Sequence, residues 1–385
     1  MSTKPLYIDV HVLQTVPPNN MNRDDTGSPK TARFGGATRS RVSSQAWKKA
    51  TRDALASLLD EDDLGQRTKY AVDLIAREIR AIAPDIEDEQ AHELASDALG
   101  ATGVKVNKDK DKGYVTGYLL FISPRQAQKL ASLAVDAFGR GVAVEKKEAR
   151  AVLDIKSHPV LNAIDIALFG RMVADAPDLN VDASVQVAHA IGVGRAEPEF
   201  DYFTAMDDRA PEDNAGAGMI GTVEFTSETL YRYATIDVMH LAENLGSVPA
   251  ARRAIETFLR AFVLSMPTGK QNSFANRTLP GGVVVQLRDT QPVSLVTAFE
   301  TPVAAVGGKS QTAMACEALV GQEGLMDKAF GVKPLETHVV CAAPGAECLA
   351  GLATGGEAES LDDLVAGVGA RAADYLAESG FVGEE

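Results

Sequence analysis

The sequence is poor in cysteine, and it contains no long run of apolar residues. Three cysteines occur among 385 residues, a small and odd number that argues against a disulfide scaffold and fits a reducing, cytoplasmic location. No apolar run approaches the ~18–20 residues that a membrane helix requires. The first residues also lack the apolar core of a secretory signal peptide, so secretion is not expected.

Motifs of several enzyme classes are missing as well. Gly269-Lys270 lacks the glycine and the hydroxyl residue that complete a phosphate-binding loop, and Gly192-x-Gly194 lacks the third glycine of a dinucleotide fingerprint. No H-E-x-x-H or C-x-x-C pattern indicates a zinc site. The sequence therefore predicts no cofactor and no bound metal.

The composition is that of an ordinary globular protein, but the charge is unevenly distributed. Apolar residues make up 45% of the chain and charged residues 24%, and the net charge is −15. Residues 1–52, however, hold nine basic and three acidic side chains, a balance of +6 that leaves −21 for the remainder. This asymmetry favours a local site for a polyanion, although a solvated charged loop would look the same on charge alone.

The beginning of the chain predicts a strand, a long loop and a helix. Apolar and polar residues alternate over residues 6–12, which is typical of a strand with one buried face. Residues 17–42 are rich in Asn, Asp, Gly, Pro and Ser and predict a loop of about 25 residues. Ser43 or Ser44 then caps a helix over residues 45–59. One stripe of this helix carries four polar side chains: Gln45, Lys48, Lys49 and Arg52.

The rest of the chain predicts an α+β fold with a helical insertion. Periodicity predicts helices at 66–83, 86–99, 124–138, 248–264 and within 355–385, and strands at 114–123, 163–172, 184–191, 222–226, 230–238 and 283–287. Residues 195–221 are polar, contain Pro and Gly, and predict a second long loop. Without the insertions the order is β, α, β, β, α, β, which is the order of a ferredoxin-like sheet and of RNA-recognition domains.

The pair Asp24-Asp25 leaves an enzymatic alternative open. Adjacent carboxylates could hold a divalent cation for phosphoryl-transfer chemistry. Neighbouring side chains rarely converge on one ion without help from other elements, so a role in shaping the loop is favoured.

A stronger signal comes from three short strings. They are N-R-D-D at residues 22–25, F-G-G at 34–36 and R-V-S-S-Q at 41–45. Together they supply Arg for phosphates, Gly for close backbone approach, and hydroxyl groups beside a helix N-terminus, which itself attracts anions. None of this chemistry selects a particular base. The strings therefore predict a groove that grips a nucleic-acid backbone without reading its sequence.

With these strings the sequence resembles the CasC family, the backbone subunits of the type I-E CRISPR surveillance complex (Cascade), which polymerise along a guide RNA. The resemblance covers most of residues 6–290 and is less diagnostic beyond about residue 300. It extends to further strings in the same order: D-I-A-L-F-G-R-M (165–172), S-V-Q-V-A-H-A-I (184–191), D-Y-F-T-A (201–205), Y-R-Y-A (231–234) and G-K-Q (269–271).

The resemblance implies a subunit shaped like a right hand. The palm is expected to be a modified ferredoxin-like, RNA-recognition-motif-like fold made from residues 1–60, 161–194 and 222–385. Residues 61–160 would form a helical finger insertion, and residues 195–221 an extended thumb loop.

The resemblance also implies which residues bind RNA. Phosphates and sugars of the guide would be held by Arg23, Lys30, Ser43, Gln45, Lys48, Arg52 and Lys270. Met172 and the thumb residues Tyr202 and Phe203 would wedge into the strand and displace bases. Family members often have Trp where Tyr202 stands. The chain also lacks the aromatic-rich sheet signature of ordinary RNA-recognition domains, which places recognition on loops.

Alternatives to the wedge roles stay open at this point. Met172 ends an apolar run and could belong to the core, the commoner position of methionine. Tyr202 and Phe203 lie near Asp207-Asp208 in a polar segment, where contact with RNA or with a neighbouring copy of the chain is favoured over burial.

Together, the motifs and the resemblance imply a non-catalytic CRISPR RNA-binding scaffold. It would coat the guide as a helical filament and present it for pairing with target DNA. Its partners would be CRISPR RNA, neighbouring copies of itself and other Cascade subunits, with no membrane. A metal-dependent ribonuclease using Asp24 and Asp25 is the alternative, and a scaffold that binds only proteins is a second one.

Overall fold

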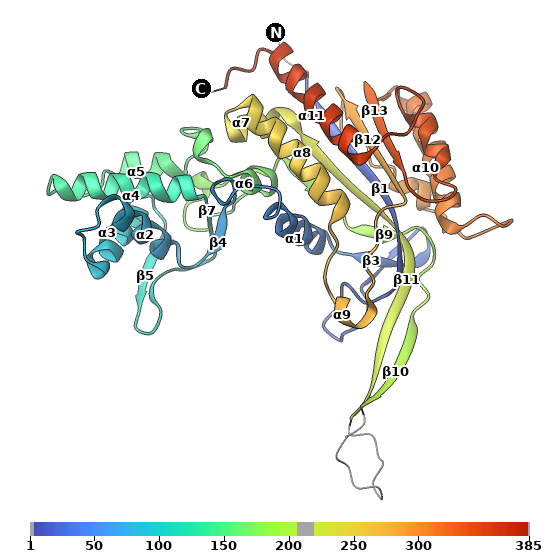
Figure 1. Ribbon diagram of the computed structural model, residues 1–385, viewed down its shortest axis with the longest axis horizontal. Coiled ribbons are helices and arrows are strands. Elements are labelled where there is room, and N and C mark those ends of the chain that lie inside the picture. Colours follow the sequence, from blue (N-terminus) through green and yellow to red (C-terminus); the bar gives the residue numbers. More distant parts are fainter. Residues whose placement is uncertain (1–3, 206–218, 384–385) are drawn as a thin grey trace, which may run out of the picture.

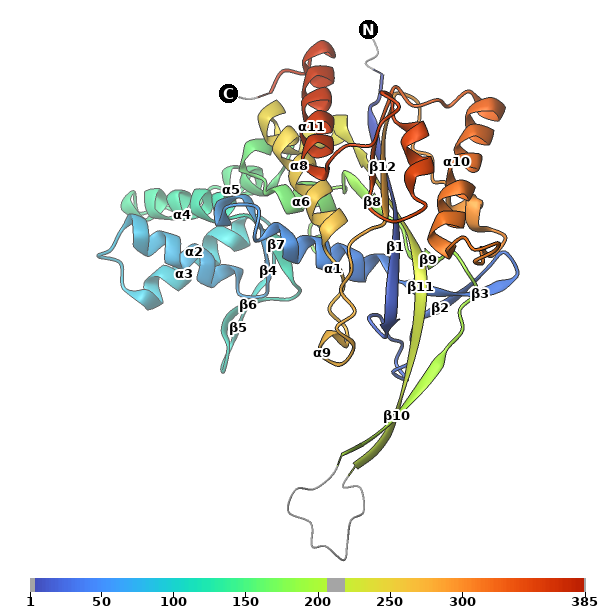
Figure 2. The same ribbon diagram turned by 45° about the vertical axis from the view of Figure 1, so that its right-hand side comes forward.

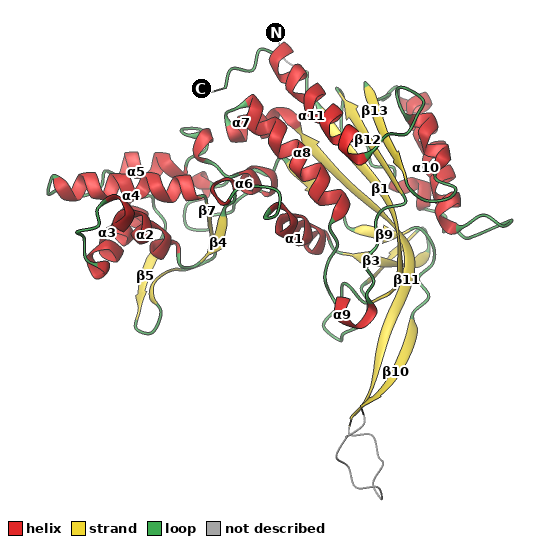
Figure 3. Ribbon diagram, viewed as in Figure 1, coloured by secondary structure: helices red, strands yellow, loops and turns green. Residues whose placement is uncertain are grey.

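A long antiparallel sheet organises the molecule, and helices cover both of its faces (Figures 1, 2 and 3). The computed structural model describes residues 4–205 and 219–383. Within them the strands follow the order β13-β12-β1-β11-β9-β3-β2, and β8 and β10 also pair with β11. The strands are β1 (Tyr7–Asn19), β2 (Thr31–Phe34), β3 (Ala37–Val42), β8 (Val185–Val187), β9 (Ala190–Gly192), β10 (Glu199–Ala205), β11 (Met219–Asp237), β12 (Gly282–Arg288) and β13 (Glu336–Cys341). The predicted α+β class is confirmed.

One face of the sheet carries the main hydrophobic core. Successive side chains of a strand point to opposite faces, and Ile8, Val10 and Val12 of β1 are fully buried against the helices of this side. Burial of each such side chain contributes about 1.5–3 kcal/mol. The helices of this side are α1 (Ser44–Leu55), α6 (Ile164–Phe169), α7 (Val238–Leu245), α8 (Val248–Leu264) and α11 (Leu361–Glu378).

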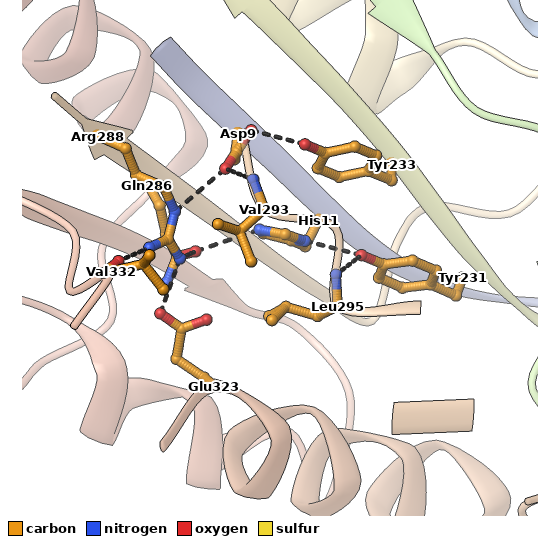
Figure 4. A network of polar contacts seen from close by, with 10 residues as sticks. All are labelled: Asp9, His11, Tyr231, Tyr233, Gln286, Arg288, Val293, Leu295, Glu323 and Val332. Carbon is orange, nitrogen blue, oxygen red and sulfur yellow. Dashed lines mark hydrogen bonds and ion pairs between the residues drawn. The ribbon is translucent and has the colours of Figure 1, made fainter. Parts of the chain in front are cut away.

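The opposite face is closed by α10 (Gln311–Phe330) over a buried polar network (Figure 4). Arg288 of β12 donates from Nε to Asp9 of β1 at 3.1 Å, and from Nη2 to Glu323 of α10 at 2.9 Å. Both carboxylates and the guanidinium group are almost completely buried. The ion pairs therefore tie the helix to the centre of the sheet.

His11 lies in the middle of the same network. Its ring nitrogens contact the Tyr231 hydroxyl at 2.9 Å and the Gln286 side-chain oxygen at 3.2 Å (Figure 4). Burial, helped by the nearby Arg288, lowers the pKa of His11 to about 3. The ring is therefore neutral at physiological pH, and this sheet face is part of the protein interior.

The inserted helical region has a hydrophobic core of its own. This core is built mainly from alanine, leucine, isoleucine and valine side chains between Ala71 and Leu179. Figure 1 shows the region extending to one side of the sheet. Its elements are β4 (Gln66–Thr68), α2 (Ala71–Ile82), α3 (Asp88–Ala101), β5 (Val106–Asp109), β6 (Gly113–Thr116), β7 (Leu120–Ile122), α4 (Pro124–Gly139) and α5 (Lys146–Leu153).

The prediction of a loop over residues 17–42 is wrong in part. β1 continues through Pro17-Pro18 to Asn19, and its register against β11 shifts between Val16 and Asn19. Proline has no backbone donor, so the shift lets the strand continue past it. Residues 31–42 form the hairpin of β2 and β3 around Gly35-Gly36, leaving a loop over residues 20–30.

The predicted strand over residues 163–172 is a short helix, α6. Residues Ile164–Leu168 are buried on all sides, and a short apolar run of this kind does not distinguish a strand from a buried helix. The two strands predicted within residues 222–238 are one strand, β11, which pairs with β1 from Thr226 to Asp237.

The predicted loop over residues 195–221 also contains regular structure. β10 pairs with the first part of β11, from Glu199↔Phe225 to Ala205↔Met219. The two strands form an arm that projects from the body of the molecule (Figures 1 and 2). Asp207-Asp208 lie outside the described residues.

Other predicted elements are confirmed with shifted ends. Strands at 6–12 and 283–287 and the helix at 248–264 are present as β1, β12 and α8, while the helix predicted from residue 66 begins at Ala71 as α2. The segment 114–123 is split into β6 and β7. None of the helices in the described part of the chain is long and apolar enough to cross a membrane.

Candidate nucleic-acid interface

The loop over residues 20–30 is held in shape by its own side chains. Oδ1 of Asp24 accepts hydrogen bonds from the backbone N–H groups of Thr26 and Ser28, each at 3.0 Å. These bonds, led by one from the Thr26 hydroxyl, lower the pKa of Asp24. Asn20 donates to the Gly27 carbonyl at 2.9 Å and to the Glu224 carbonyl at 2.8 Å. The loop-shaping interpretation of Asp24 is therefore confirmed.

The same loop is joined to the N-terminus of α1. Oδ1 of Asn22 accepts the backbone N–H of Ser43 at 2.8 Å. The Ser43 hydroxyl in turn caps α1 by accepting the N–H of Ala46 at 3.3 Å. Ser43, rather than Ser44, is thus the N-cap, and exposed Gln45 lies in the first turn beside it.

A second loop brings Lys270 to this place. A Cβ at Gly269 would lie 2.2 Å from the Met21 carbonyl oxygen, so only glycine allows the two loops to touch. Lys270 follows with φ +54°, a left-handed conformation that is uncommon outside glycine, at the start of α9 (Gln271–Phe274). Lys270 therefore lies beside the loop that carries Arg23 and Lys30.

Four of the nine basic side chains in residues 1–52 are already used by the protein. Lys4, Lys49 and Arg52 form ion pairs with Asp289, Asp53 and Asp165 respectively. Arg39 is fully buried and donates to the carbonyl oxygens of Gly192, Val193, Phe299 and Glu300. Arg39 and Arg52 thus serve the interior of the fold, whereas Lys4 and Lys49 form exposed surface pairs, which contribute little to stability.

The other five form no ion pair with any described residue: Arg23, Lys30, Arg33, Arg41 and Lys48. Lys48 is half-buried on α1, and desolvation lowers the pKa of its ammonium group. A cation that is partly desolvated without a carboxylate partner gains from a bound anion. We define the basic surface as Arg23, Lys30, Arg41, Gln45, Lys48 and Lys270, which lie on the two loops, at the end of β3 and at the start of α1. Ser43, also predicted to bind RNA, is buried beside this surface, and its hydroxyl is used to cap α1.

Arg52 has contacts that differ from those of its neighbours on α1. Its Nε donates to Oδ2 of Asp165 at 2.9 Å, its Nη2 donates to the Gly65 carbonyl at 2.9 Å, and its guanidinium group stacks 4.5 Å from the Phe121 ring centre. Arg52 thus connects α1 with α6 and the inserted region. An RNA contact by Arg52 stays a prediction, and its observed contacts give it a structural role.

Met172 is 80% exposed, which excludes the alternative that it belongs to the core. The residue before it, Arg171, is buried and donates to the carbonyl oxygens of Leu153 and Leu179. Arg171 also exchanges two backbone hydrogen bonds with Val181. Met172 therefore projects into solvent from a firmly held backbone, as a wedge residue would.

Tyr202 and Phe203 both lie on β10, but their side chains point to opposite faces of the arm because they are adjacent in a strand. Tyr202 is 64% exposed and shares its face with Phe200, which is 70% exposed. Phe203 is half-buried over Gly221, its partner on β11, where a Cβ would lie 2.4 Å from the ring. The two residues cannot insert side by side into one stack of bases.

Arg41 and Asn22 belong to this interface but are not among the individually predicted RNA-binding residues. Asn22 binds the protein's own Ser43, and Arg41 lies at the end of β3 next to the α1 N-terminus. Asn22 begins the string N-R-D-D and Arg41 begins R-V-S-S-Q, so the sequence motifs did indicate both positions. Within the described residues, no group of three or more His, Cys, Asp or Glu side chains has the arrangement of a metal site.

Comparison with known proteins identifies the class. The chain belongs to the family of CT1975-like proteins, whose model matches residues 8–367. A chain of a solved structure titled "CRISPR RNA-guided surveillance complex, pre-nicking" is 32% identical with a TM-score of 0.80, and the match covers 95% of this chain and 100% of that one. A second, titled "CRISPR RNA-guided surveillance complex", is 27% identical with a TM-score of 0.70, covering 95% and 99%. None of the curated proteins compared with the chain matches it.

These matches confirm the predicted resemblance to CasC-like proteins. They extend to residue 367, well beyond the region in which the sequence strings were diagnostic. A CRISPR-associated role follows from them.

Proposed function

We propose that this chain is a non-catalytic scaffold that binds CRISPR RNA in a type I-E surveillance complex. The observation that carries the proposal is the basic surface: cations without ion-pair partners in the described chain, gathered at a helix N-terminus by two interlocked loops. Arginine, lysine and a helix N-terminus bind phosphates but do not distinguish bases. Such a surface suits a guide whose bases are left for pairing.

The arrangement of the sheet supports a modified ferredoxin-like palm. The central strands run β12-β1-β11-β8, all antiparallel, with α1 and α8 on one face, which matches the split βαβ order. An ordinary RNA-recognition domain stacks bases on its open sheet face. Here α10 and the Arg288 network cover that face, so the loops at the start of α1 are left as the RNA-binding site.

The arm of β10 and β11 supports contact between neighbouring copies. It projects from the body (Figure 2) and exposes Phe200, Tyr202 and Ile220. Exposed aromatic side chains on a projecting element are typical of a partner surface. An arm that contacts a different surface of the next copy gives a head-to-tail, open filament along the RNA, which would present the guide to target DNA.

The test is whether RNA co-purifies with the protein. The chain should be expressed with the other complex subunits and a CRISPR array, purified through a tag, and treated with RNase or DNase before electrophoresis. We expect discrete, RNase-sensitive RNA of guide length. Recovery of the intact assembly without nucleic acid would contradict the proposal and support a scaffold that binds only proteins.

The ribonuclease alternative has its own test. Labelled RNA should be incubated with Mg²⁺ or Mn²⁺ and either the wild-type protein or the double variant Asp24→Asn with Asp25→Asn. We expect the same low background of RNA cleavage with both proteins. Metal-dependent cleavage that disappears in the variant would establish the nuclease.

A further inference from the structure

His189 stands next to the basic surface, although the sequence gives it no role. It lies between β8 and β9, and β9 pairs with β3 through Arg41↔Ile191 and Val42↔Ala190. If this antiparallel register is continued by one residue on each strand, His189 comes to lie beside Ser43, the N-cap of α1. The histidine is exposed.

One hydrogen bond fixes the orientation of the ring proton. Nη1 of Arg41 lies 3.2 Å from Nδ1 of His189. A guanidinium group can only donate, so Nδ1 must be the acceptor, and the neutral ring carries its proton on Nε2. Nε2–H has no hydrogen-bond partner among the described residues and is a donor available to a ligand.

The charges around His189 are all positive. Burial first, and then Arg41 and Lys30, lower the pKa of the imidazole, and no carboxylate of the described residues opposes them. Arg41 is held by a bond from Nε to the Thr31 carbonyl at 3.2 Å, and its backbone N–H is bound to the Lys30 carbonyl at 2.8 Å. The position therefore combines one held guanidinium group, a nearby lysine without an ion-pair partner among the described residues, and one oriented neutral donor. This arrangement suits an anion.

We propose that His189 binds a phosphodiester group of the RNA through Nε2–H, together with Arg41 and Lys30. The inference rests on the proposed RNA-binding function and deepens it. The imidazolium form carries its second proton on Nδ1, so it gives up the hydrogen bond from Arg41, and the two cations disfavour it in the free protein. A bound phosphate offsets the cations and so favours this form. Binding at this position therefore takes up a proton as the pH falls, and RNA affinity becomes pH-dependent.

The test is the affinity of the full-length protein for a guide-length RNA between about pH 5.5 and 8, at constant ionic strength. The wild type should bind more tightly as the pH falls, by up to about tenfold for each unit by which the phosphate raises the imidazole pKa. His189→Gln keeps a neutral donor but does not titrate, so its RNA affinity should show a flatter pH dependence than that of the wild type. His189→Lys supplies a fixed charge and should bind tightly across the range.

His240→Gln is the matched control. His240 lies on α7, outside the elements that form the basic surface, and its Nδ1 is 3.6 Å from Oε2 of Glu243. It should keep the pH dependence of the wild type. Equal pH dependence in the wild type and His189→Gln, with RNA still bound, would overturn this inference alone. Absence of RNA binding by the wild type at every pH would overturn the proposed function as well.

Discussion

Arg52 of α1 and Asp165 of α6 form an ion pair, with 2.9 Å between Nε and Oδ2. The carboxylate is 1% exposed and the arginine side chain 32% exposed, and burial raises the pKa of Asp165. Arg52 therefore compensates a buried anion, and it fixes α1 to α6, which precedes Met172 in the chain. A residue predicted to hold RNA therefore has a structural role within the fold.

Arg52→Ala is expected to destabilise the subunit without RNA present. Loss of the cation leaves Asp165 buried without its counter-charge, which should cost about 2–3 kcal/mol, less than for a fully buried pair because Arg52 is partly solvated. Denaturant unfolding of the RNA-free protein measures it. An unchanged free energy of unfolding would show that the ion pair contributes nothing to the fold.

Lys48→Ala should show the opposite behaviour. Lys48 has no ion-pair partner among the described residues, so its loss should change the free energy of unfolding by less than about 0.5 kcal/mol. RNA affinity should fall equally for unrelated sequences, and the slope of log K against log [salt] should decrease by about 0.7, the value for one single-strand phosphate contact. Lys49→Ala, which removes the adjacent cation that is paired with Asp53, is the control. Sequence-selective loss of affinity would exclude a phosphate contact by Lys48.

Tyr202 and Phe203 of the arm should also differ, one affecting RNA binding and the other the structure of the arm. Tyr202→Ala removes an exposed ring and should leave the Tm of the RNA-free protein unchanged, while RNA affinity falls by about 1–3 kcal/mol if the ring stacks on a base. Phe203→Ala removes the ring that covers Gly221 and should increase hydrogen exchange of the β10 and β11 amides. Thermal melts, hydrogen exchange and sedimentation with guide-length RNA measure these effects. Equal effects of both changes on RNA-dependent assembly would contradict their placement on opposite faces.

Lowering the pH should decrease the free energy of unfolding, because the buried His11 resists protonation in the folded protein. Its pKa is about 3 in the folded protein against the ordinary histidine value of 6.5 in the unfolded chain. Between these values the unfolded chain binds a proton that the folded chain excludes. The stabilisation is complete above about pH 6.5 and is lost as the pH falls, by up to about 1.4 kcal/mol per pH unit.

Denaturant unfolding of the wild type and His11→Gln from about pH 7 to 4 tests this. Glutamine can replace both hydrogen bonds but does not titrate, so its stability should depend less on pH in this range. Burial raises the pKa of Asp9 and Glu323, and both remain in the variant, so their contributions largely cancel in the comparison. Parallel pH profiles would contradict the assignment to His11.

The local elements with a clear period could be predicted from the sequence. The strand at residues 6–12 and the helix at 248–264 each bury one regular stripe of apolar side chains, and this stripe is visible in the sequence. The segment 163–172 could not be assigned, because α6 is buried on all sides and so has no stripe. The arm at 199–205 has no apolar stripe facing a core, and its strand pairing comes from β11.

For the candidate site, residue type identified the region but not the individual contacts. Arg39 and Lys48 contribute equally to the net charge of residues 1–52. In the structure, however, Arg39 donates hydrogen bonds to four carbonyl groups, whereas Lys48 has no ion-pair partner in the described chain. Which cation is paired depends on residues far away in the sequence, such as Asp165 for Arg52. Partners at that separation are determined by the tertiary fold alone.

The most direct measurement compares two variants that lose the same charge at different places. The first replaces four cations of the basic surface by alanine: Arg23, Lys30, Lys48 and Lys270. The second replaces four exposed cations that are ion-paired elsewhere: Lys4, Arg80, Lys105 and Lys309. Each variant loses one arginine and three lysines, so net charge changes equally.

Affinity for several unrelated guide-length RNAs should be measured over a range of salt concentrations. The basic-surface variant should lose affinity for all sequences alike, with the salt slope reduced by about 3, the sum of four single-strand phosphate contacts. The second variant should stay close to the wild type. Equal losses in the two variants, or no loss in the first, would contradict the conclusion that these positions hold the RNA backbone.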